Sequence, residues 1–263
     1  MEIIKSLWAY RGFILGTVKR EFQSKYRNSL LGAAWTVINP LAMIIVYTVV
    51  FSQLMRAKLP EVDGVFGYSI FLCAGSLAWG LFVEITTRSQ SMFLDNSNLL
   101  KKLNFPRLCL PISIVVTGVL NFLIVFGLFT LFLLVTGNFP GLVFISLVPL
   151  FALLIVFSAG LGMVLGVLNV FFRDVGQFFN ALVPFWFWFT PIVYPPALIP
   201  EWVRPFAALN PIASLIGAVQ NVLVLGAWPI WGQLHYPIAL ALMLCILGLR
   251  LFHKRSAEMA DEL

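Results

Sequence analysis

Residues 141–171 read GLVFISLVPLFALLIVFSAGLGMVLGVLNVF, a stretch without a single charged side chain. A helix that crosses the hydrocarbon core of a bilayer needs roughly 20 predominantly apolar residues, and this stretch exceeds that length. Five further stretches have the same character, at 31–55, 66–92, 108–136, 176–197 and 232–252. The sequence therefore predicts an all-α integral membrane protein with six transmembrane helices.

The overall composition supports this fold class. Hydrophobic residues make up 60% of the chain and charged residues only 11%, with a mean hydropathy of +0.96, whereas soluble domains contain about 25% charged residues. The apolar stretches follow one another without a Ser/Gly-rich linker, so we expect one transmembrane domain over residues 1–263. Cys73, Cys109 and Cys245 are odd in number and scattered, which suggests neither a disulfide framework nor a metal site.

The basic residues indicate the orientation of the chain. The net charge is +6, and the charges lie beside apolar spans, which favours a membrane surface over nucleic acid as the partner. Lys and Arg remain preferentially on the cytoplasmic side. Six spans with both termini in the cytoplasm place thirteen of the seventeen basic residues inside and three outside, with Arg88 within the second span. We therefore predict a multi-pass membrane protein with both termini in the cytoplasm.

Residues 198–231 are also apolar but contain Asn and Pro. They could form a seventh span or a pair of half-inserted helices. A seventh span would move the basic C-terminal cluster to the outside, so we predict a re-entrant or surface-lying external segment between the fifth and sixth spans. Non-helical backbone survives at membrane depth only where protein or a water-filled cavity satisfies it, and such a segment hints at a transport pathway.

The first 28 residues differ in kind from the spans. Apolar residues recur every three to four positions, while most of the basic residues lie elsewhere; the apolar set is Ile4, Trp8, Leu15, Val18 and Phe22. This pattern predicts an amphipathic helix at the cytoplasmic interface. The alternative is an ordinary basic flank of the first span.

No motif for catalysis or nucleotide hydrolysis occurs in the chain, which lacks a phosphate-binding loop, a nucleophile elbow and an H-E-x-x-H pattern. We therefore predict a non-catalytic chain with no catalytic, cofactor-binding or metal-binding residues. Charges inside spans are costly and often functional. Glu84 and Arg88 are four residues apart on the second span, so they share a helix face and are expected to form an intramembrane pair of structural or functional importance.

Residues 93–107 form a predicted cytoplasmic loop with a short helix. Its apolar side chains are more than a solvated loop needs, and they suggest a protein partner beneath the membrane; with the adjacent lysines the candidate contact residues are Leu99, Leu100, Lys101, Lys102 and Phe105. The alternative is a simple basic loop.

The fifth span is rich in aromatic residues. An interfacial belt is the default for Trp186 and Trp188, whereas Phe178, Phe185 and Phe189 share one face with Leu182 and could line a route for sugars. Pro184 within this span and the prolines that follow it are expected to interrupt helical hydrogen bonding. The candidate gate consists of Pro191, Tyr194, Pro195 and Pro196, although kinks of this kind can also be merely structural.

Taken together, the chain resembles the membrane subunits of bacterial type 2 ABC exporters for polysaccharides, the Wzm and KpsM-like permeases. The resemblance covers nearly the whole chain. It rests on the order and spacing of Arg27 to Trp35 with Asn39-Pro40, Asn98 to Lys102 with Phe105-Pro106, Arg173-Asp174, and Thr190 to Tyr194.

The resemblance implies a six-helix permease that forms a homodimer and binds two copies of a separate cytoplasmic ATPase, which carries ATP and Mg²⁺. Its substrate would be an undecaprenyl-linked polysaccharide, with O-antigen as the expected cargo, passing through a channel at the dimer interface. In such a protein of the bacterial inner membrane, the N-terminal helix and the loop at 99–105 would contact the ATPase. The segment after Tyr194 would form short periplasmic gate helices.

Other functions stay open at this stage. The same machinery could export capsule, teichoic acid or a hydrophobic drug. An ion-coupled secondary carrier would show several buried acids, and a lipid-modifying membrane enzyme would show His, Asp or Glu clustered at a membrane face; the sequence shows neither pattern.

Overall fold

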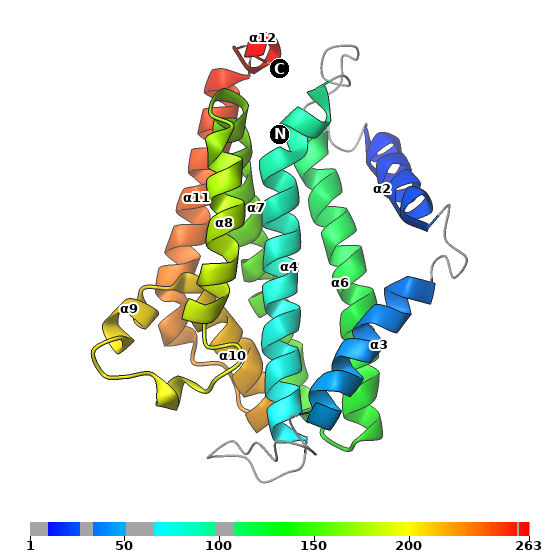
Figure 1. The fold of residues 1–263 in the computed structure, drawn as a ribbon, viewed down its shortest axis with the longest axis vertical. Coiled ribbons are helices and arrows are strands. Elements are labelled where there is room, and N and C mark those ends of the chain that lie inside the picture. The colour runs from blue at the N-terminus through cyan, green and yellow to red at the C-terminus, as the bar shows by residue number, and fades with distance from the viewer. Residues whose placement is uncertain (1–9, 27–33, 51–65, 98–107, 257, 263) are drawn as a thin grey trace.

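The computed structural model of the chain describes residues 10–26, 34–50, 66–97, 108–256 and 258–262. These residues form helices joined by turns and loops, and no β-strand occurs among them. The all-α fold class is therefore confirmed. The α-helices, drawn in Figure 1, are α2 (Arg11–Tyr26), α3 (Trp35–Tyr47), α4 (Gly67–Asp95), α6 (Cys109–Val135), α7 (Leu147–Phe171), α8 (Asp174–Phe189), α9 (Arg204–Ala208), α10 (Pro211–Leu225), α11 (His235–Arg255) and α12 (Glu258–Glu262).

Within the described ranges, four helices are long and apolar enough to cross a membrane: Gly67–Asp95, Cys109–Val135, Gly141–Phe171 and Trp231–Arg255. They correspond to the second, third, fourth and sixth predicted stretches. The first stretch lies only partly within the described residues, as α3. The fifth folds as α8, whose 16 residues span about 24 Å, less than the ~30 Å hydrocarbon core. That the chain crosses the membrane six times therefore stays a prediction.

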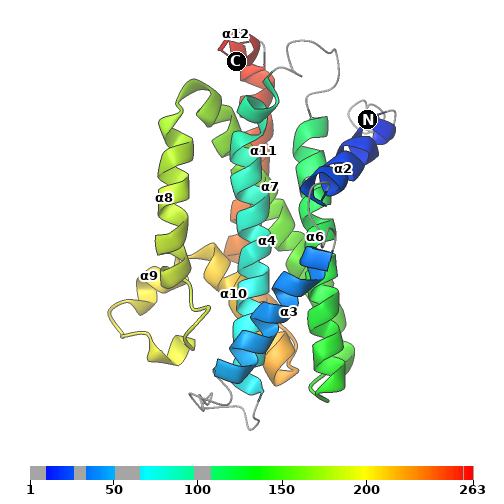
Figure 2. The ribbon, with the colours of Figure 1, turned by 45° about the vertical axis from the view of Figure 1, so that its right-hand side comes forward.

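Helices α4 and α7 form the centre of the bundle. Most residues of α4 are buried, and α4 packs against α6, α7, α8 and α10. Helix α7 lies between α4 and α11. Helices α2 and α3 both pack on α6, on the side of the molecule away from α8 (Figure 2).

Small residues on α7 allow both of its neighbours to approach closely. A Cβ atom added to Gly166 would lie 2.5 Å from the carbonyl oxygen of Ser89 on α4, and one added to Gly160 would lie 2.8 Å from the backbone nitrogen of Cys245 on α11. Close packing of this kind is a main source of helix association in membranes. It explains why a chain with few charged residues still has a defined helix arrangement.

The helices run between two ends of the molecule. The end of α4, the start of α6, the turn between α7 and α8, and α12 lie at one end, which we call the α12 end (Figures 1 and 2). The turn between α6 and α7 and helix α9 lie at the opposite end, which we call the α9 end. Gly137 terminates α6 there with a positive φ of 72°, a conformation that glycine adopts without strain.

Large apolar side chains cover the outer faces of the peripheral helices. On α6 they include Leu123 and Leu131, and on α11 they include Leu242 and Ile246, each more than half exposed. A face of this kind is unfavourable in water, but it suits contact with lipid chains.

Candidate functional site

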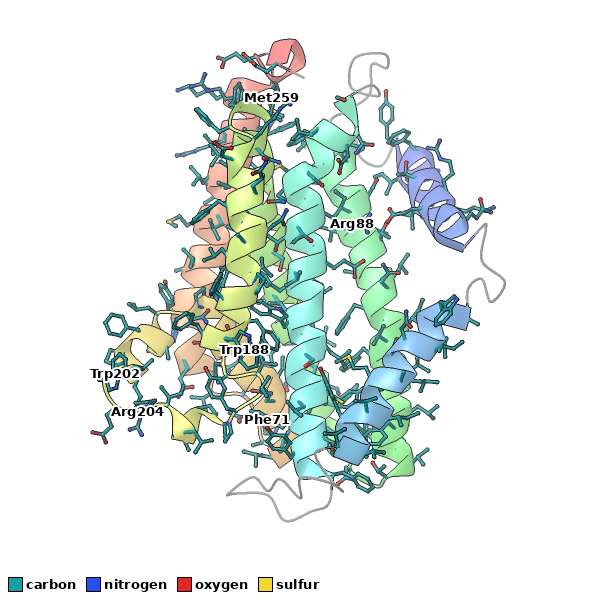
Figure 3. All side chains as sticks on the ribbon, in the orientation of Figure 1. Phe71, Arg88, Trp188, Trp202, Arg204 and Met259 are labelled. Atoms are coloured by element: carbon teal, nitrogen blue, oxygen red, sulfur yellow. The ribbon has the colours of Figure 1, made fainter. Side chains whose placement is uncertain are left out.

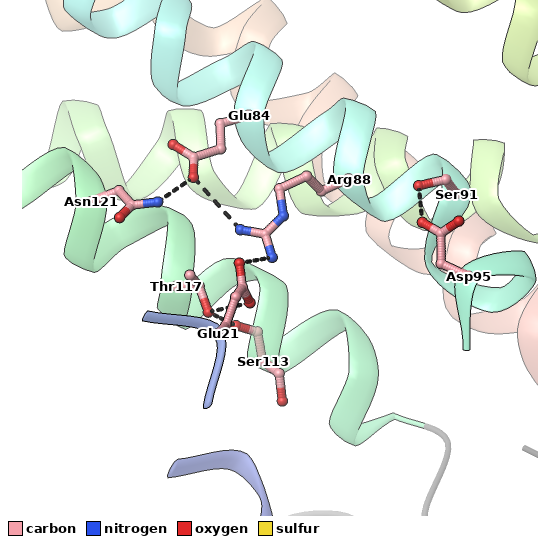
Figure 4. A network of polar contacts seen from close by, with 8 residues as sticks. All are labelled: Glu21, Glu84, Arg88, Ser91, Asp95, Ser113, Thr117 and Asn121. Carbon is pink, nitrogen blue, oxygen red and sulfur yellow. Dashed lines mark hydrogen bonds and ion pairs between the residues drawn. The ribbon is translucent and has the colours of Figure 1, made fainter. Parts of the chain in front are cut away.

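A polar network lies between α2, α4 and α6, in the half of α4 nearer the α12 end (Figures 3 and 4). Arg88 Nη1 lies 3.6 Å from Glu84 Oε1, which places the predicted intramembrane pair in contact on one face of α4. Asn121 on α6 donates a hydrogen bond to the same Glu84 oxygen at 2.6 Å. The pair thus also connects α4 to α6.

Glu21 of α2 completes this network, because it forms an ion pair with Arg88 and accepts a hydrogen bond of 3.3 Å from Thr117 on α6. We call Glu21, Glu84, Arg88, Thr117 and Asn121 the α2–α4–α6 network. Sequence reasoning found only Glu84 and Arg88, because helical spacing links residues of one helix. Nothing in the sequence pattern shows which side of α2 meets the bundle.

The packing face of α2 agrees with the predicted apolar face at Val18 and differs from it at Leu15. Ile14 and Val18 are buried, and they pack with Cys109 at the start of α6. Leu15, which the predicted face included, is 63% exposed and points away from that contact. The face toward α6 therefore follows Ile14, Val18 and Glu21, at helical spacings of four and three residues. Ile4 and Trp8 lie outside the described residues.

The predicted ATPase-coupling residues Leu99, Leu100, Lys101, Lys102 and Phe105 lie outside the described residues. The structure does show how the preceding helix ends. The second span was expected to end at residue 92, yet α4 continues to Asp95, whose carboxylate accepts a hydrogen bond of 2.6 Å from the hydroxyl of Ser91. The side chain of Asn96 then donates to the carbonyl of Met92 at 2.8 Å and ends the helix.

Helix α8 has two aromatic faces with different environments. Trp186 packs on Phe82 of α4 with ring centroids 5.2 Å apart, and Phe187 packs on Trp79 at 5.7 Å. Trp186 is partly buried and packs against the core of the bundle. The three predicted channel residues lie on the outer side of α8 and are about two-thirds exposed: Phe178, Phe185 and Phe189.

The structure does not break α8 at Pro184, which lies inside the continuous helix. The chain turns only after Phe189, over residues 190–196, and we call this segment the α8–α9 turn. Three residues of this turn, Thr190, Pro191 and Ile192, are buried. The predicted gate residues Tyr194 and Pro195 are partly buried, and Pro196 is exposed at the start of a short 3₁₀ helix, Pro196–Leu198.

Hydrogen bonds from two other helices hold the α8–α9 turn. The hydroxyl of Tyr68 on α4 donates to the carbonyl of Val193. The buried amide of Gln220 on α10 donates to the carbonyl of Phe71 on α4 at 3.2 Å, and it reaches the carbonyl of Ile192 at 3.5 Å. The turn is thus tied to both α4 and α10, and neither tie is visible in the sequence pattern.

Asn210 joins the end of α8 to the start of α10. Its side-chain oxygen accepts from the backbone nitrogen of Ile212 at 3.1 Å, which is the N-cap interaction of α10. The same oxygen accepts from Trp186 Nε1 at 3.0 Å, and its amide donates to the hydroxyl of Thr190 at 2.9 Å. The sequence order Asn-Pro signals the cap, but it does not reveal the two contacts to α8.

Comparison with known proteins identifies the family. The sequence profile of the family described as "ABC-2 type transporter" matches residues 14–224 of this chain. The chain belongs to this family.

Individual relatives cover nearly the whole ABC-2 chain. It is 30% identical to the O-antigen export system permease protein RfbA of Myxococcus xanthus over 266 residues, covering 100% of both chains. It is also 30% identical to the protein of the same name from Klebsiella pneumoniae over 243 residues, covering 92% of this chain and 91% of the relative. The polysialic acid transport protein KpsM of Escherichia coli is 23% identical over 245 residues, covering 91% of this chain and 92% of the relative.

The ABC-2 membership gives the structural features a setting. The four long apolar helices fit the spans of a multi-pass membrane protein, and the exposed apolar side chains of α6 and α11 suit contact with lipid. Among the described residues of this ABC-2 chain, no group of three or more His, Cys, Asp or Glu side chains lies together in a way that could hold a metal ion. The polar features that the fold does build connect helices: the α2–α4–α6 network, and the hydrogen bonds around the α8–α9 turn.

Proposed function

We propose that this chain is the permease subunit of an ATP-driven ABC transporter that exports a lipid-linked polysaccharide, with O-antigen as the cargo, across the bacterial inner membrane. The observation that carries the proposal is the alignment with an O-antigen export permease over the full length of both chains. Such coverage leaves no large part of the relative without a counterpart here.

The energy for transport comes from a partner protein in this proposal. The sequence lacks a phosphate-binding loop, so ATP and Mg²⁺ bind to a separate cytoplasmic ATPase, two copies of which join a homodimer of this chain. The ATPase contacts the loop at 99–105 and helix α2. The α2–α4–α6 network then carries the contact from α2 to α4, because Glu21 and Arg88 pair directly.

The proposed orientation places the α12 end in the cytoplasm and the α9 end in the periplasm. The distribution of Lys and Arg supports it, and α2 and α12 lie toward the same end of the molecule (Figure 1). Helices α3 and α8 complete six spans together with the four long helices. Residues 198–231, including α9 and α10, form the periplasmic gate segment.

The proposed route for the undecaprenyl-linked chain runs along α8 at the dimer interface. The exposed faces of Phe178, Phe185 and Phe189 line it, and the α8–α9 turn forms its outer gate. An aromatic lining suits a glycan, because the negative face of an aromatic ring attracts the C–H groups of a sugar, whose carbons are attached to oxygen.

Capsular polysaccharide is the second candidate cargo. The specific observation in its favour is the likeness to a polysialic acid transport protein over most of both chains. The identity of 23% is lower than the 30% shared with the O-antigen permeases, so O-antigen remains the first choice.

Deletion of this chain from its host tests the proposal. Surface glycan and the intracellular pool of lipid-linked polymer are then compared on gels with those of the parent strain and of a strain complemented with the intact chain. We expect loss of surface O-antigen together with accumulation of polymer inside the cell. Normal surface O-antigen with loss of capsule would select the second cargo, and normal levels of both would refute polysaccharide export.

A further inference from the structure

A separate apolar core lies at the α12 end of the molecule, and five helices contribute to it. We call it the α12-end core; its buried members are Met92 and Phe93 of α4, Leu110 and Ile114 of α6, Met163, Val167 and Val170 of α7, Phe252 of α11, and Met259 of α12. The ring of Phe93 stacks on that of Phe252, with centroids 5.7 Å apart. Helices that are far apart in the chain are thus joined at this end by one apolar contact.

Met259 holds α12 in place at this core (Figure 3). Its side chain is 1% exposed, whereas Glu258 and Glu262 on the same helix are exposed. A helix of 5 residues is not stable by itself in water, so its position depends on the groups that anchor it. Besides Met259 these include Arg255, which forms an ion pair with Glu258 and lies 5.8 Å from the centre of the Phe171 ring at the end of α7.

The α12-end core also joins the ends of several helices. Helix α4 ends at Asp95, shortly after Phe93, and α6 begins at Cys109, directly before Leu110. Helix α7 ends directly after Val170. In the proposed orientation these ends face the cytoplasm and the ATPase. The side chain of Met259 packs in the core that connects all three of them.

We propose that α12 is a clamp on the ATPase-facing helix ends, and that Met259 is a positioning residue for coupling to the ATPase. The inference rests on the proposed function and adds a residue-level device to it. By filling the α12-end core, Met259 keeps the end of α4 and the start of α6 in the relative position that the ATPase recognises. Met259 itself does not contact the ATPase, because it is buried.

The composition of the α12-end core supports a joint that can shift. Three of the seven methionines of the chain belong to it, namely Met92, Met163 and Met259. The larger core around Phe82 and Phe157 has no methionine among its described members. The unbranched thioether side chain of methionine adapts when its neighbours move. A core of this composition can stay in contact while the helix ends change position during a cycle of the ATPase.

Two other roles for α12 compete with the clamp. Met259 could serve only to shield the apolar core from water, in which case its loss would lower stability and leave ATPase binding unchanged. Alternatively, the exposed carboxylates of Glu258 and Glu262 could bind the ATPase directly. The clamp differs from both, because it makes ATPase binding depend on the buried side chain and not on the exposed ones.

The test uses the full chain in lipid nanodiscs and the ATPase that copurifies with the tagged chain from its host. Titration gives the affinity for the ATPase, and hydrogen exchange of the amides in the last turn of α4 reports on that helix end. We expect Met259→Ser to speed this exchange at least about tenfold, since a cavity in a core lowers the free energy of local opening. The amides of α10, at the other end of the molecule, should exchange as in the wild type.

The affinity for the ATPase is the decisive measurement. Met259→Ser should weaken it at least about fivefold, within the range for residues that act on a site through packed neighbours. Met259→Leu should restore most of the affinity, because it keeps an apolar side chain of similar volume. Termination of the chain after Ser256 removes α12 without placing a polar group in the core, and it should weaken binding as Met259→Ser does. This second variant decides the question if Met259→Ser does not accumulate in the membrane.

Glu262→Ser is the matched control, since it introduces the same residue at an exposed position of the same helix and should leave the affinity unchanged. Faster exchange of α4 with unchanged affinity in Met259→Ser would overturn the clamp and reduce α12 to a cover for the core. An equal loss of affinity in Glu262→Ser would also overturn it, in favour of direct contact. If the wild-type chain binds no ATPase at all, the proposed ATP-driven permease fails as well, so the two failures can be told apart.

Discussion

At the scale of single residues, Arg88 is the contact point of three helices. It pairs with Glu84 on its own helix and with Glu21 on α2, and Asn121 of α6 bonds to Glu84. Its side chain is 30% exposed. A charge in a largely apolar setting is stabilised only while its partners remain in place.

A double-mutant cycle measures this contact. Glu21→Gln and Arg88→Gln should each lower the thermal stability of the detergent-purified protein, and the double variant should lose less than the sum of the two. We expect a coupling energy of about 0.5–3 kcal/mol, as for residues in one network. The surface pair Glu201 and Arg204, 3.9 Å apart and far more exposed, should show no measurable coupling. Additive effects of Glu21→Gln and Arg88→Gln would contradict the network.

Asn210 is the second residue on which several elements depend. Asn210→Ala removes the cap of α10 and leaves the Trp186 N–H and the Thr190 hydroxyl without this partner, so we expect a loss of about 1–2 kcal/mol from the cap alone. We also expect faster proteolysis in the α8–α9 turn. Asn221→Ala on an exposed position of α10 is the control. Equal melting temperatures of the two variants would show that the cap is dispensable.

At the scale of elements, the contact of α4 with α7 depends on glycine. Gly166→Ala would place a methyl group 2.5 Å from a backbone oxygen of α4, and overpacking of this kind costs about 1–3 kcal/mol. We expect a lower melting temperature in detergent and a lower yield of folded protein after purification. Gly80→Ala on α4 meets nothing within 4 Å, so it should leave the melting temperature unchanged or raise it slightly.

The predicted coupling loop can be tested as an element through its apolar side chains. Leu99→Asp should uncouple the partner ATPase by placing a charge in an apolar contact, while the permease still inserts into the membrane. Export in the deletion strain and copurification of the ATPase are the measurements. Lys101→Gln, which keeps the apolar residues, should leave copurification largely intact. Full ATPase binding by Leu99→Asp would remove the loop from the interface.

At the scale of the whole molecule, the orientation in the membrane is the main prediction. The background is a variant whose three native cysteines are replaced by serine. In it, Lys102→Cys should react with a membrane-impermeant maleimide only after the membrane is permeabilised, which lets the reagent reach the cytoplasmic face. Lys58→Cys should react in intact spheroplasts, because it follows the first predicted span. Labelling of Lys102→Cys from outside would invert the proposed topology.

Hydrophobic periodicity predicted the fold well where single helices decide it. Four of the six predicted apolar stretches, the second, third, fourth and sixth, became the four long helices, and Glu84 and Arg88 could be paired because i and i+4 positions share a face. Contacts between segments far apart in the chain could not be predicted from the sequence. The partners Glu21 and Gln220 were missed, since their roles depend on how α2 and α10 lie against α4. The prediction that Pro184 interrupts the fifth span was also wrong. Pro184 lies inside α8, and the chain turns only after Phe189.

Helix α4 carries both polar connections along one uninterrupted rod. Arg88 binds α2 near the α12 end, and the carbonyl of Phe71 receives Gln220 near the other end, 17 residues and about 26 Å away. No proline interrupts α4 between these two contacts, and the helix is continuous over this length. A movement of α4 that begins at its contact with α2 would also displace the carbonyl to which Gln220 of α10 bonds. It would therefore reach the α8–α9 turn without passing through α8. The two ends of the molecule would then move together through one helix, α4.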